Sequence, residues 1–144
     1  MLVCWDLAWP EAFRALFMQG VELVVVPSYW VADDLTDEGR IHDPEASGEK
    51  SWLDSLVITR AYENECVVAF VNCGGPAAEG FLGCSGVAAP FKGCIGRTKG
   101  CEEEVKVVEV DLDVLVVSNL YSILRIPGCL ANSLPNRARG MCIR

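Results

Sequence analysis

The chain has 144 residues, of which 51% are hydrophobic and 22% are charged, and its formal net charge is −8. This length suits one ordinary domain with a real core. The acidic balance argues against a nucleic-acid backbone or an anionic membrane surface as the main partner. No uninterrupted apolar run approaches the roughly 18–20 residues that span a bilayer, so we expect neither a nucleic-acid nor a membrane partner.

Eight cysteines are a high count for this length. The N-terminus has no basic segment and Asp6 interrupts its apolar stretch, so we expect no signal peptide. A cytoplasmic protein with reduced, buried thiols follows from that expectation. No C-x-x-C pair occurs, and the only histidine, His42, lies in a polar stretch. We therefore expect no structural zinc site, no other metal and no cofactor.

The first 27 residues predict a strand, a helix and a second strand. Residues 2–4 match the end of a buried strand, Pro10 suits the first position of a helix, and Gly20 is placed to end it. Residues 21–27, "VELVVVP", are β-branched and nearly all apolar, which is typical of a strand covered on both faces. This order predicts a βαβ unit over residues 2–27 with a parallel strand pair.

The middle of the chain predicts a loop, a helix and a further buried strand. Residues 31–50 are polar and predict a long surface loop, which is either a solvated excursion or a wall over a site. Residues 51–65 predict a helix, because Ser51 and Asp54 fit a capping pattern before an apolar face. Residues 66–72, "CVVAFVN", predict the next strand.

Beyond residue 72 the pattern changes from α/β to a β meander. Short strands are predicted at 81–90, 92–98 and 104–112, and Lys99-Gly100 suits a hairpin turn. Residues 114–127 are apolar, whereas residues 128–144 have no steady period. We therefore divide the chain into a domain at 1–113 and a tail of undetermined structure at 114–144.

Cys4 is the candidate nucleophile, because it stands at a predicted strand end just before a helix. Such junctions expose side chains at the carboxyl edge of an α/β sheet, where sites form. A thiolate attacks electrophilic carbon once its proton is removed, and the following backbone N–H groups can face an oxyanion. Taken alone, the position favours a packed thiol, since seven other cysteines are present.

A family resemblance shifts that balance towards catalysis. Residues 2–30 resemble the cysteine-nucleophile region of the nitrilase, or carbon–nitrogen hydrolase, superfamily. The matching positions are Cys4, Trp5, Asp6, Pro10, Glu11, Arg14, Gly20, Pro27 and Trp30. Three later segments, 59–75, 83–93 and 105–113, resemble further family motifs in the same order. The resemblance thus covers residues 1–113.

The resemblance implies a fold and a reaction. The family fold is a four-layer α-β-β-α sandwich, and its members usually self-associate, so a homo-oligomer is implied for the full-length form. The implied reaction is hydrolysis of a nonpeptide C–N bond in a nitrile or amide, through a cysteine thioimidate or acyl-enzyme that water cleaves. A glutamate base and a lysine complete the family site. Only the cysteine maps onto this sequence, at Cys4.

The remaining candidate site residues fall into two groups. By position we expect Trp5, Trp30 and Asn72 to line the substrate site, with the backbone N–H of Trp5 as an oxyanion ligand. By resemblance we expect Asp6, Glu11 and Arg14 to be structural residues near it, with Glu11 close to the helix arginine. Arg60 and Glu63 are expected to make structural polar contacts.

The sequence therefore predicts the carboxyl-terminal part of a carbon–nitrogen hydrolase, an α/β chain whose amino-terminal portion is missing. Its apolar content exceeds what the predicted layers bury, so we expect exposed apolar surface. Activity of the chain alone is expected to be negligible, because the base and the lysine are absent. Two alternatives stay open: an inactive fragment or pseudoenzyme that pairs with a full-length relative, and an artefact of an internal start methionine.

Overall fold

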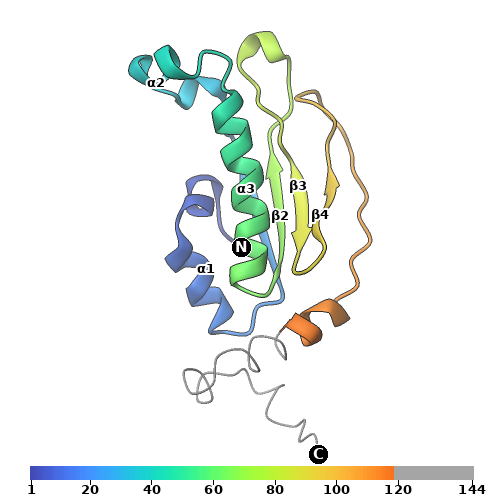
Figure 1. Cartoon of the computed structure of the whole chain (residues 1–144). Helices are drawn as coiled ribbons and strands as arrows, with labels where there is room; N and C mark the ends of the chain where they lie inside the picture. The colour runs from blue at the N-terminus through green and yellow to red at the C-terminus, as the bar shows by residue number, and fades with distance from the viewer. Residues whose placement is uncertain (119–144) are drawn as a thin grey trace, which may run out of the picture.

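The computed structural model describes residues 1–118, which form one mixed four-stranded sheet with helices packed on it (Figure 1). The strands are β1 (Leu23–Ser28), β2 (Val67–Asn72), β3 (Gly86–Ala89) and β4 (Gly93–Arg97), and they stand in that order across the sheet. β1 and β2 are parallel, whereas β3 and β4 add antiparallel strands. The expected α/β class is confirmed, and the parallel pair lies at one edge.

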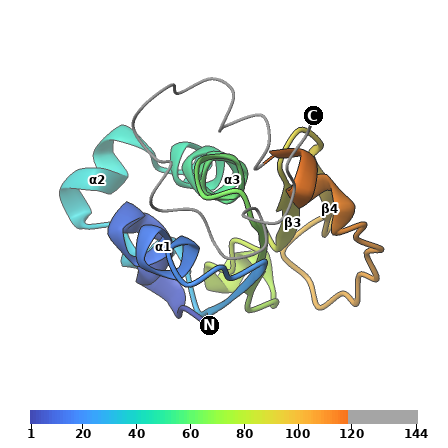
Figure 2. The ribbon, with the colours of Figure 1, turned by 90° about the horizontal axis from the view of Figure 1, so that it is seen from below.

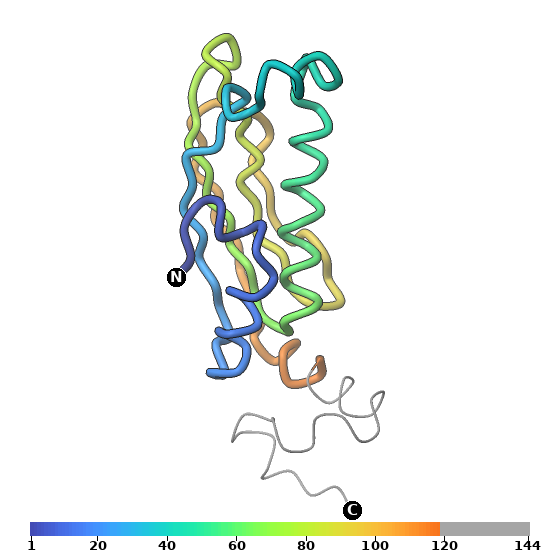
Figure 3. The backbone as a smooth tube through the Cα atoms, turned by 90° about the vertical axis from the view of Figure 1, so that its left-hand side faces the viewer, coloured from blue at the N-terminus to red at the C-terminus, as the bar shows by residue number. Residues whose placement is uncertain are grey.

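Two α-helices lie on the sheet, and the longer one makes the more extensive contacts with the strands. The helix α1 spans Pro10–Phe17 with proline at its first position, as expected, and Gly20 follows it at φ +74°. The long helix α3 (Ser47–Glu63) connects β1 to β2 and runs beside the strands (Figure 3). Figure 2 shows α1 and α3 on the same side of the sheet. The short elements are η1 (Cys4–Ala8), η2 (Ala32–Asp34), α2 (Asp37–His42) and η3 (Ala77–Glu79).

The core lies between these helices and the sheet. Alternate residues of the strands, such as Val24, Val26, Val68 and Phe70, point into it. From the helical side it is filled by Leu7 of η1, Phe13 of α1, Trp30, and Leu53, Val57 and Ala61 of α3. A second, smaller cluster on the opposite face joins Val67, Ala89 and Leu115. The helices of the described residues fall short of the length and apolarity that crossing a bilayer takes.

The predicted first strand does not form. The backbone N–H of Leu2 donates to the carbonyl of Val25 at 3.1 Å, as a strand neighbour would, but φ of Cys4 is +49° and the chain turns at once into η1. The parallel pair is therefore β1 with β2 across α3, and the predicted βαβ unit of residues 2–27 is wrong. The strand β1 was predicted to be covered on both faces, but one of its faces is exposed at Leu23 and Val25.

The predicted 31–50 loop contains η2, α2 and the first turn of α3. The helix begins at Ser47 because the carboxylate of Asp43 accepts hydrogen bonds from the backbone N–H groups of Ser47, Gly48 and Glu49. The capping role predicted for Ser51 is therefore wrong, and its hydroxyl donates to the carbonyl of Ser47 within the helix.

The meander is shorter than predicted. The strands predicted at 81–90 and 92–98 form in shorter versions as β3 and β4, which are joined by a turn at residues 90–92. Residues 104–112 form no strand, so the hairpin predicted at Lys99-Gly100 is wrong. Lys99 donates its backbone N–H to the side chain of Glu104 instead of closing a hairpin. In the predicted tail, residues 114–118 belong to a helical stretch that begins at residue 113. The rest of the tail, residues 119–144, lies outside the described residues.

Candidate active site

The turn η1 carries Cys4, Trp5 and Asp6, and its backbone is fixed at both ends. At the start, the carboxylate of Asp6 accepts the backbone N–H of Val3 at 2.9 Å. At the end, the buried guanidinium of Arg60 donates through Nε to the carbonyl of Leu7 at 3.0 Å and through Nη2 to that of Ala8 at 2.9 Å. Because both ends are tied by charge-assisted hydrogen bonds, the cysteine between them has a defined position.

Arg60 reaches η1 from α3 and is 6% exposed. Its charge is balanced by Glu63, whose Oε1 lies 2.6 Å from Nη1. A buried guanidinium is tolerated only when it is paired and hydrogen-bonded, and here three acceptors surround it. The structural contacts expected of Arg60 and Glu63 are therefore confirmed, and the arginine that fixes the cysteine turn lies on α3.

Cys4 is half-buried and holds a backbone conformation that side chains rarely adopt, with φ +49°. Such a left-handed residue costs roughly 1–3 kcal/mol and persists only where its surroundings enforce it, often at functional sites. Its Sγ accepts a hydrogen bond from the hydroxyl of Ser28, the last residue of β1, at 3.3 Å. The structure thus brings the cysteine to the carboxyl end of β1, which is the edge that the sequence predicted.

A cluster of three tryptophans lies beside the cysteine turn. The ring of Trp5 stacks on that of Trp30 at 4.8 Å between centroids, and Trp52 of α3 contacts both. Trp30 is fully buried and its indole N–H donates to Glu49 at 2.8 Å. Trp5 is half exposed. Of these rings, Trp5 therefore offers accessible surface next to Cys4, while Trp30 supports it from behind.

Asn72 ends β2 opposite Ser28 in the strand register. Its side-chain amide is fully engaged: Oδ1 accepts the backbone N–H of Trp30, and Nδ2 donates to the carbonyls of Trp30 and Gly83. The side chain is also buried. These bonds join the end of β2 to the segments that carry Trp30 and Gly83, so the contact of Asn72 with the site passes through Trp30.

Glu11 and Arg14 lie on the exposed side of α1. The guanidinium of Arg14 sits over the ring of Phe17, 5.3 Å from its centroid. These two residues are thus part of the helix surface, whereas the side chain that holds the end of the cysteine turn is that of Arg60. Ser28 was missed altogether, although its position after "VVVP" at a strand end is the signal that singled out Trp30 and Asn72.

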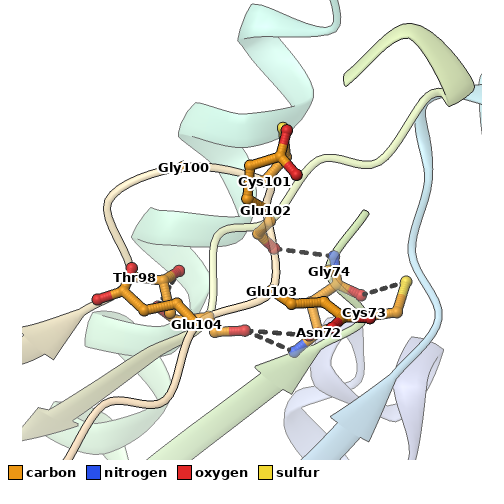
Figure 4. A pocket seen from close by; sticks show the side chains of 11 residues that line it. Asn72, Cys73, Gly74, Thr98, Gly100, Cys101, Glu102, Glu103 and Glu104 are labelled. Atoms are coloured by element: carbon orange, nitrogen blue, oxygen red, sulfur yellow. Dashed lines mark hydrogen bonds between the residues drawn. The ribbon is translucent and has the colours of Figure 1, made fainter. Parts of the chain in front are cut away.

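A cavity of about 160 Å³ opens next to Asn72 and Cys73. Figure 4 shows the acidic segment 102–104 passing over these residues. The chain approaches closely there, since a Cβ on Gly74 would come within 3.1 Å of the Glu102 backbone. Cys4 is not among the lining residues. No group of three or more acidic, histidine or cysteine side chains in residues 1–118 is arranged to hold a metal ion.

The other cysteines differ from Cys4 in surroundings. Cys66 is buried in the core, and burial raises the pKa of its thiol to about 12. Burial also raises the thiol pKa of Cys73 and of Cys84. The expectation of buried thiols holds for Cys66 alone among these, because Cys94 is exposed and the others are half-buried. A thiol held protonated is a poor nucleophile, which argues against Cys66, Cys73 and Cys84 in that role.

Comparison with known proteins decides the family. The family model described as carbon-nitrogen hydrolase matches residues 1–117. The chain belongs to the carbon–nitrogen hydrolase family. Among curated relatives, a Pseudomonas (R)-stereoselective amidase is 32% identical over 80% of this chain and 37% of its own length. The 2-oxoglutaramate amidase of Bacillus subtilis is 30% identical over 77% of this chain and 37% of its own length.

Solved structures agree with this assignment. An amidase from Nesterenkonia sp. AN1 is 32% identical, with a TM-score of 0.56 over 80% of this chain and 40% of that one. The carbon-nitrogen hydrolase of Helicobacter pylori G27 is 21% identical and shares the fold, with a TM-score of 0.63 over 85% and 43%. This hydrolase-family chain thus spans about two fifths of these relatives, as expected for part of a domain.

Proposed function

We propose that this chain supplies the cysteine nucleophile of an amidase-type carbon–nitrogen hydrolase, with Cys4 in that role. The observation that carries the proposal is the conformation of the half-buried Cys4, at φ +49° on a turn held by Asp6 and Arg60, with its sulfur in contact with Ser28 at the end of β1. One of the structures of the Nesterenkonia amidase shows acrylamide added at its active-site cysteine. That relative supports a cysteine mechanism in this family.

The proposed reaction proceeds in two steps. The thiolate of Cys4 attacks the amide carbon, so that a C–S bond forms and the carbonyl electrons move to oxygen. The backbone N–H of Trp5 is the proposed donor to that oxygen. Collapse breaks the C–N bond to give a thioester, and the proton that the thiol lost goes to the nitrogen of the leaving amine. Water then attacks the thioester carbon, which releases the acid and restores the thiol.

Amides are the proposed substrate class, because the relatives named above are amidases. The half-exposed face of Trp5, backed by Trp30 and Trp52, is the proposed wall against which the substrate lies. Of the family's catalytic residues, the resemblance maps only the cysteine onto these 144 residues. We therefore expect negligible turnover from the 144 residues alone, since groups that act as a unit lose most of the rate when one is absent.

A fusion protein tests this proposal. The residues of the Pseudomonas amidase that precede its matched region are placed before residue 1, and ammonia release from aliphatic amides is measured. We expect Cys4→Ala to lower the rate by about 10³-fold or more. The matched control is Cys94→Ala, which removes an exposed thiol on β4 and should leave the rate unchanged. Retained hydrolysis in the Cys4→Ala fusion would reject Cys4 as the nucleophile.

A second candidate function is that of an inactive partner of a full-length relative. The observation that favours it is the apolar surface on the outward face of the sheet, where Leu23 and Val71 are each about half exposed. Co-purification of the tagged chain with the intact relative would support this function. A chain that light scattering finds monomeric, alone and mixed with the relative, would reject it.

A further inference from the structure

Ser28 makes a contact to which the sequence analysis and the family assignment give no role. It is the last residue of β1, and its hydroxyl donates to the Sγ of Cys4 at 3.3 Å across 24 residues of chain. Among the described residues, this is the one hydrogen bond that reaches the Cys4 sulfur. The contact therefore links the sheet edge directly to the proposed nucleophile.

Both partners stand on backbone that is already fixed. The carbonyl of Ser28 accepts the N–H of Cys73 at 3.0 Å, which continues the β1–β2 pairing past Asn72. On the other side, the N–H of Leu2 is bonded to Val25, three residues before Ser28 on the same strand. The hydroxyl and the sulfur thus meet without further ordering of the chain, so the contact is preorganised.

The chemical type of its hydrogen-bond partner distinguishes Cys4 from Cys73, Cys84 and Cys94. The sulfurs of Cys84 and Cys94 lie 3.4 Å and 3.5 Å from the carbonyl oxygens of Leu82 and Gly96, to which they donate. The sulfur of Cys73 likewise donates, to Oδ1 of Asn72 at 3.8 Å. A donor thiol must keep its proton to make such a bond. The neighbour of the Cys4 sulfur is a hydroxyl, which is able to donate, so this contact survives loss of the thiol proton.

We propose that Ser28 is a positioning residue that orients the sulfur of Cys4 and favours its thiolate form; this inference rests on the proposed role of Cys4 as nucleophile. A hydrogen bond to an ionised acceptor is stronger than the same bond to a neutral one. The Ser28 hydroxyl therefore binds the thiolate more tightly than the thiol. The stabilisation comes from a neutral group, so it does not require a cation near the cysteine.

The test measures the reactivity of Cys4 in the full 144-residue chain as a function of pH. Iodoacetamide alkylation is followed for each cysteine peptide by mass spectrometry, with Cys94 as the internal reference. The variants are Ser28→Ala, which removes the hydroxyl, and Ser28→Thr, which keeps it and suits a strand. Ser55→Ala is the matched control, because the Ser55 hydroxyl is bonded only to the helix backbone of α3 among the described contacts.

We expect Ser28→Ala to slow alkylation of Cys4 near neutral pH by about 3- to 10-fold and to move its pH–rate profile to higher pH. Ser28→Thr should stay within about twofold of the unsubstituted chain, and Cys94 should react equally in every variant. An unmoved Cys4 profile in Ser28→Ala would overturn the inference. A Ser28→Thr variant as slow as Ser28→Ala, or equal slowing of Cys94, would overturn it as well.

This experiment is independent of hydrolysis. If the fusion protein loses no activity in Cys4→Ala while the Cys4 profile still responds to Ser28, the proposed function fails and the thiolate contact stands. If the fusion depends on Cys4 but the profile does not respond to Ser28, the positioning role fails alone. The two proposals are thus separated by their readouts.

Discussion

The two faces of the β1–β2 pair are built from the same kinds of residue and have opposite surroundings. Val24 is 1% exposed beneath the helices, whereas its neighbour Val25 is 37% exposed on the outward face. On β2, Phe70 is buried and Val71 is 52% exposed. Alternation along a strand sends successive side chains to opposite faces, so the difference lies in what covers each face.

Coverage of the outward face ends part-way across the sheet. At the start of β2 and on β3 it is covered by Leu115, which packs with Val67 and Ala89. Along β1 and at the end of β2 it is open, since Leu23, Val25 and Val71 are exposed. The strands are therefore apolar on both faces, while α1 and α3 cover one face and the helical stretch with Leu115 covers only part of the other. The exposed apolar surface that the sequence predicted is confirmed for residues 1–118.

The largest expected effect separates the two faces on β2. Phe70→Ala should lower the free energy of unfolding by about 3–5 kcal/mol, because it leaves a cavity under the helices. Val71→Ala, its neighbour on the outward face, should cost less than about 1 kcal/mol. Urea unfolding followed by circular dichroism gives both values. Equal losses for the two variants would show that the outward face is covered in solution.

A second, smaller effect marks where outward coverage begins. Leu115→Ala should lower the free energy of unfolding by about 2–3 kcal/mol, since this leucine is almost fully buried against Val67 and Ala89. Val117→Ala is the matched control, because Val117 lies in the same helical stretch and is exposed. If both variants unfold at the same urea concentration as the unsubstituted chain, the small cluster contributes nothing to stability.

The sequence predicted the parts of the fold that depend on local patterns. Proline at the first position of α1 and the apolar β2 run were correct, because capping chemistry and β-branched residues act within a few positions. The start of α3 was placed four residues late, since its cap comes from Asp43, which lies before the apolar pattern begins. The prediction of a strand at 104–112 was wrong. Alternation of apolar and polar residues within one segment does not show whether a neighbouring strand is there to pair with it.

The site was likewise predicted only where it depends on residues that are close together in the sequence. Motif order singled out Cys4, Trp5 and Asp6, which share one short turn. Two of the contacts to this turn come from Arg60 and Ser28, which are distant from it in the sequence. Arg60 lies within a helix and Ser28 at a strand end, and neither position by itself indicates such a contact. Spacing alone does not show that a helix arginine reaches back 53 residues. Tertiary contacts of this length need the structure.

The smallest expected effect concerns the helix that covers the buried face. Although burial opposes it, hydrogen bonds from the N–H groups of Glu49, Ser47 and Gly48 and from the Ser47 hydroxyl lower the pKa of Asp43 below its ordinary value of 3.8. A carboxyl with a lowered folded pKa stabilises the fold above its unfolded pKa and loses that contribution as the pH falls through the folded value. Asp43→Asn should therefore destabilise the chain at neutral pH and progressively less below 3.8. Urea unfolding at neutral pH and at a pH below 3.8 checks this, with Asp37→Asn as the matched control outside α3. A destabilisation that stays constant with pH would mean that the charge of Asp43 does not hold the start of α3.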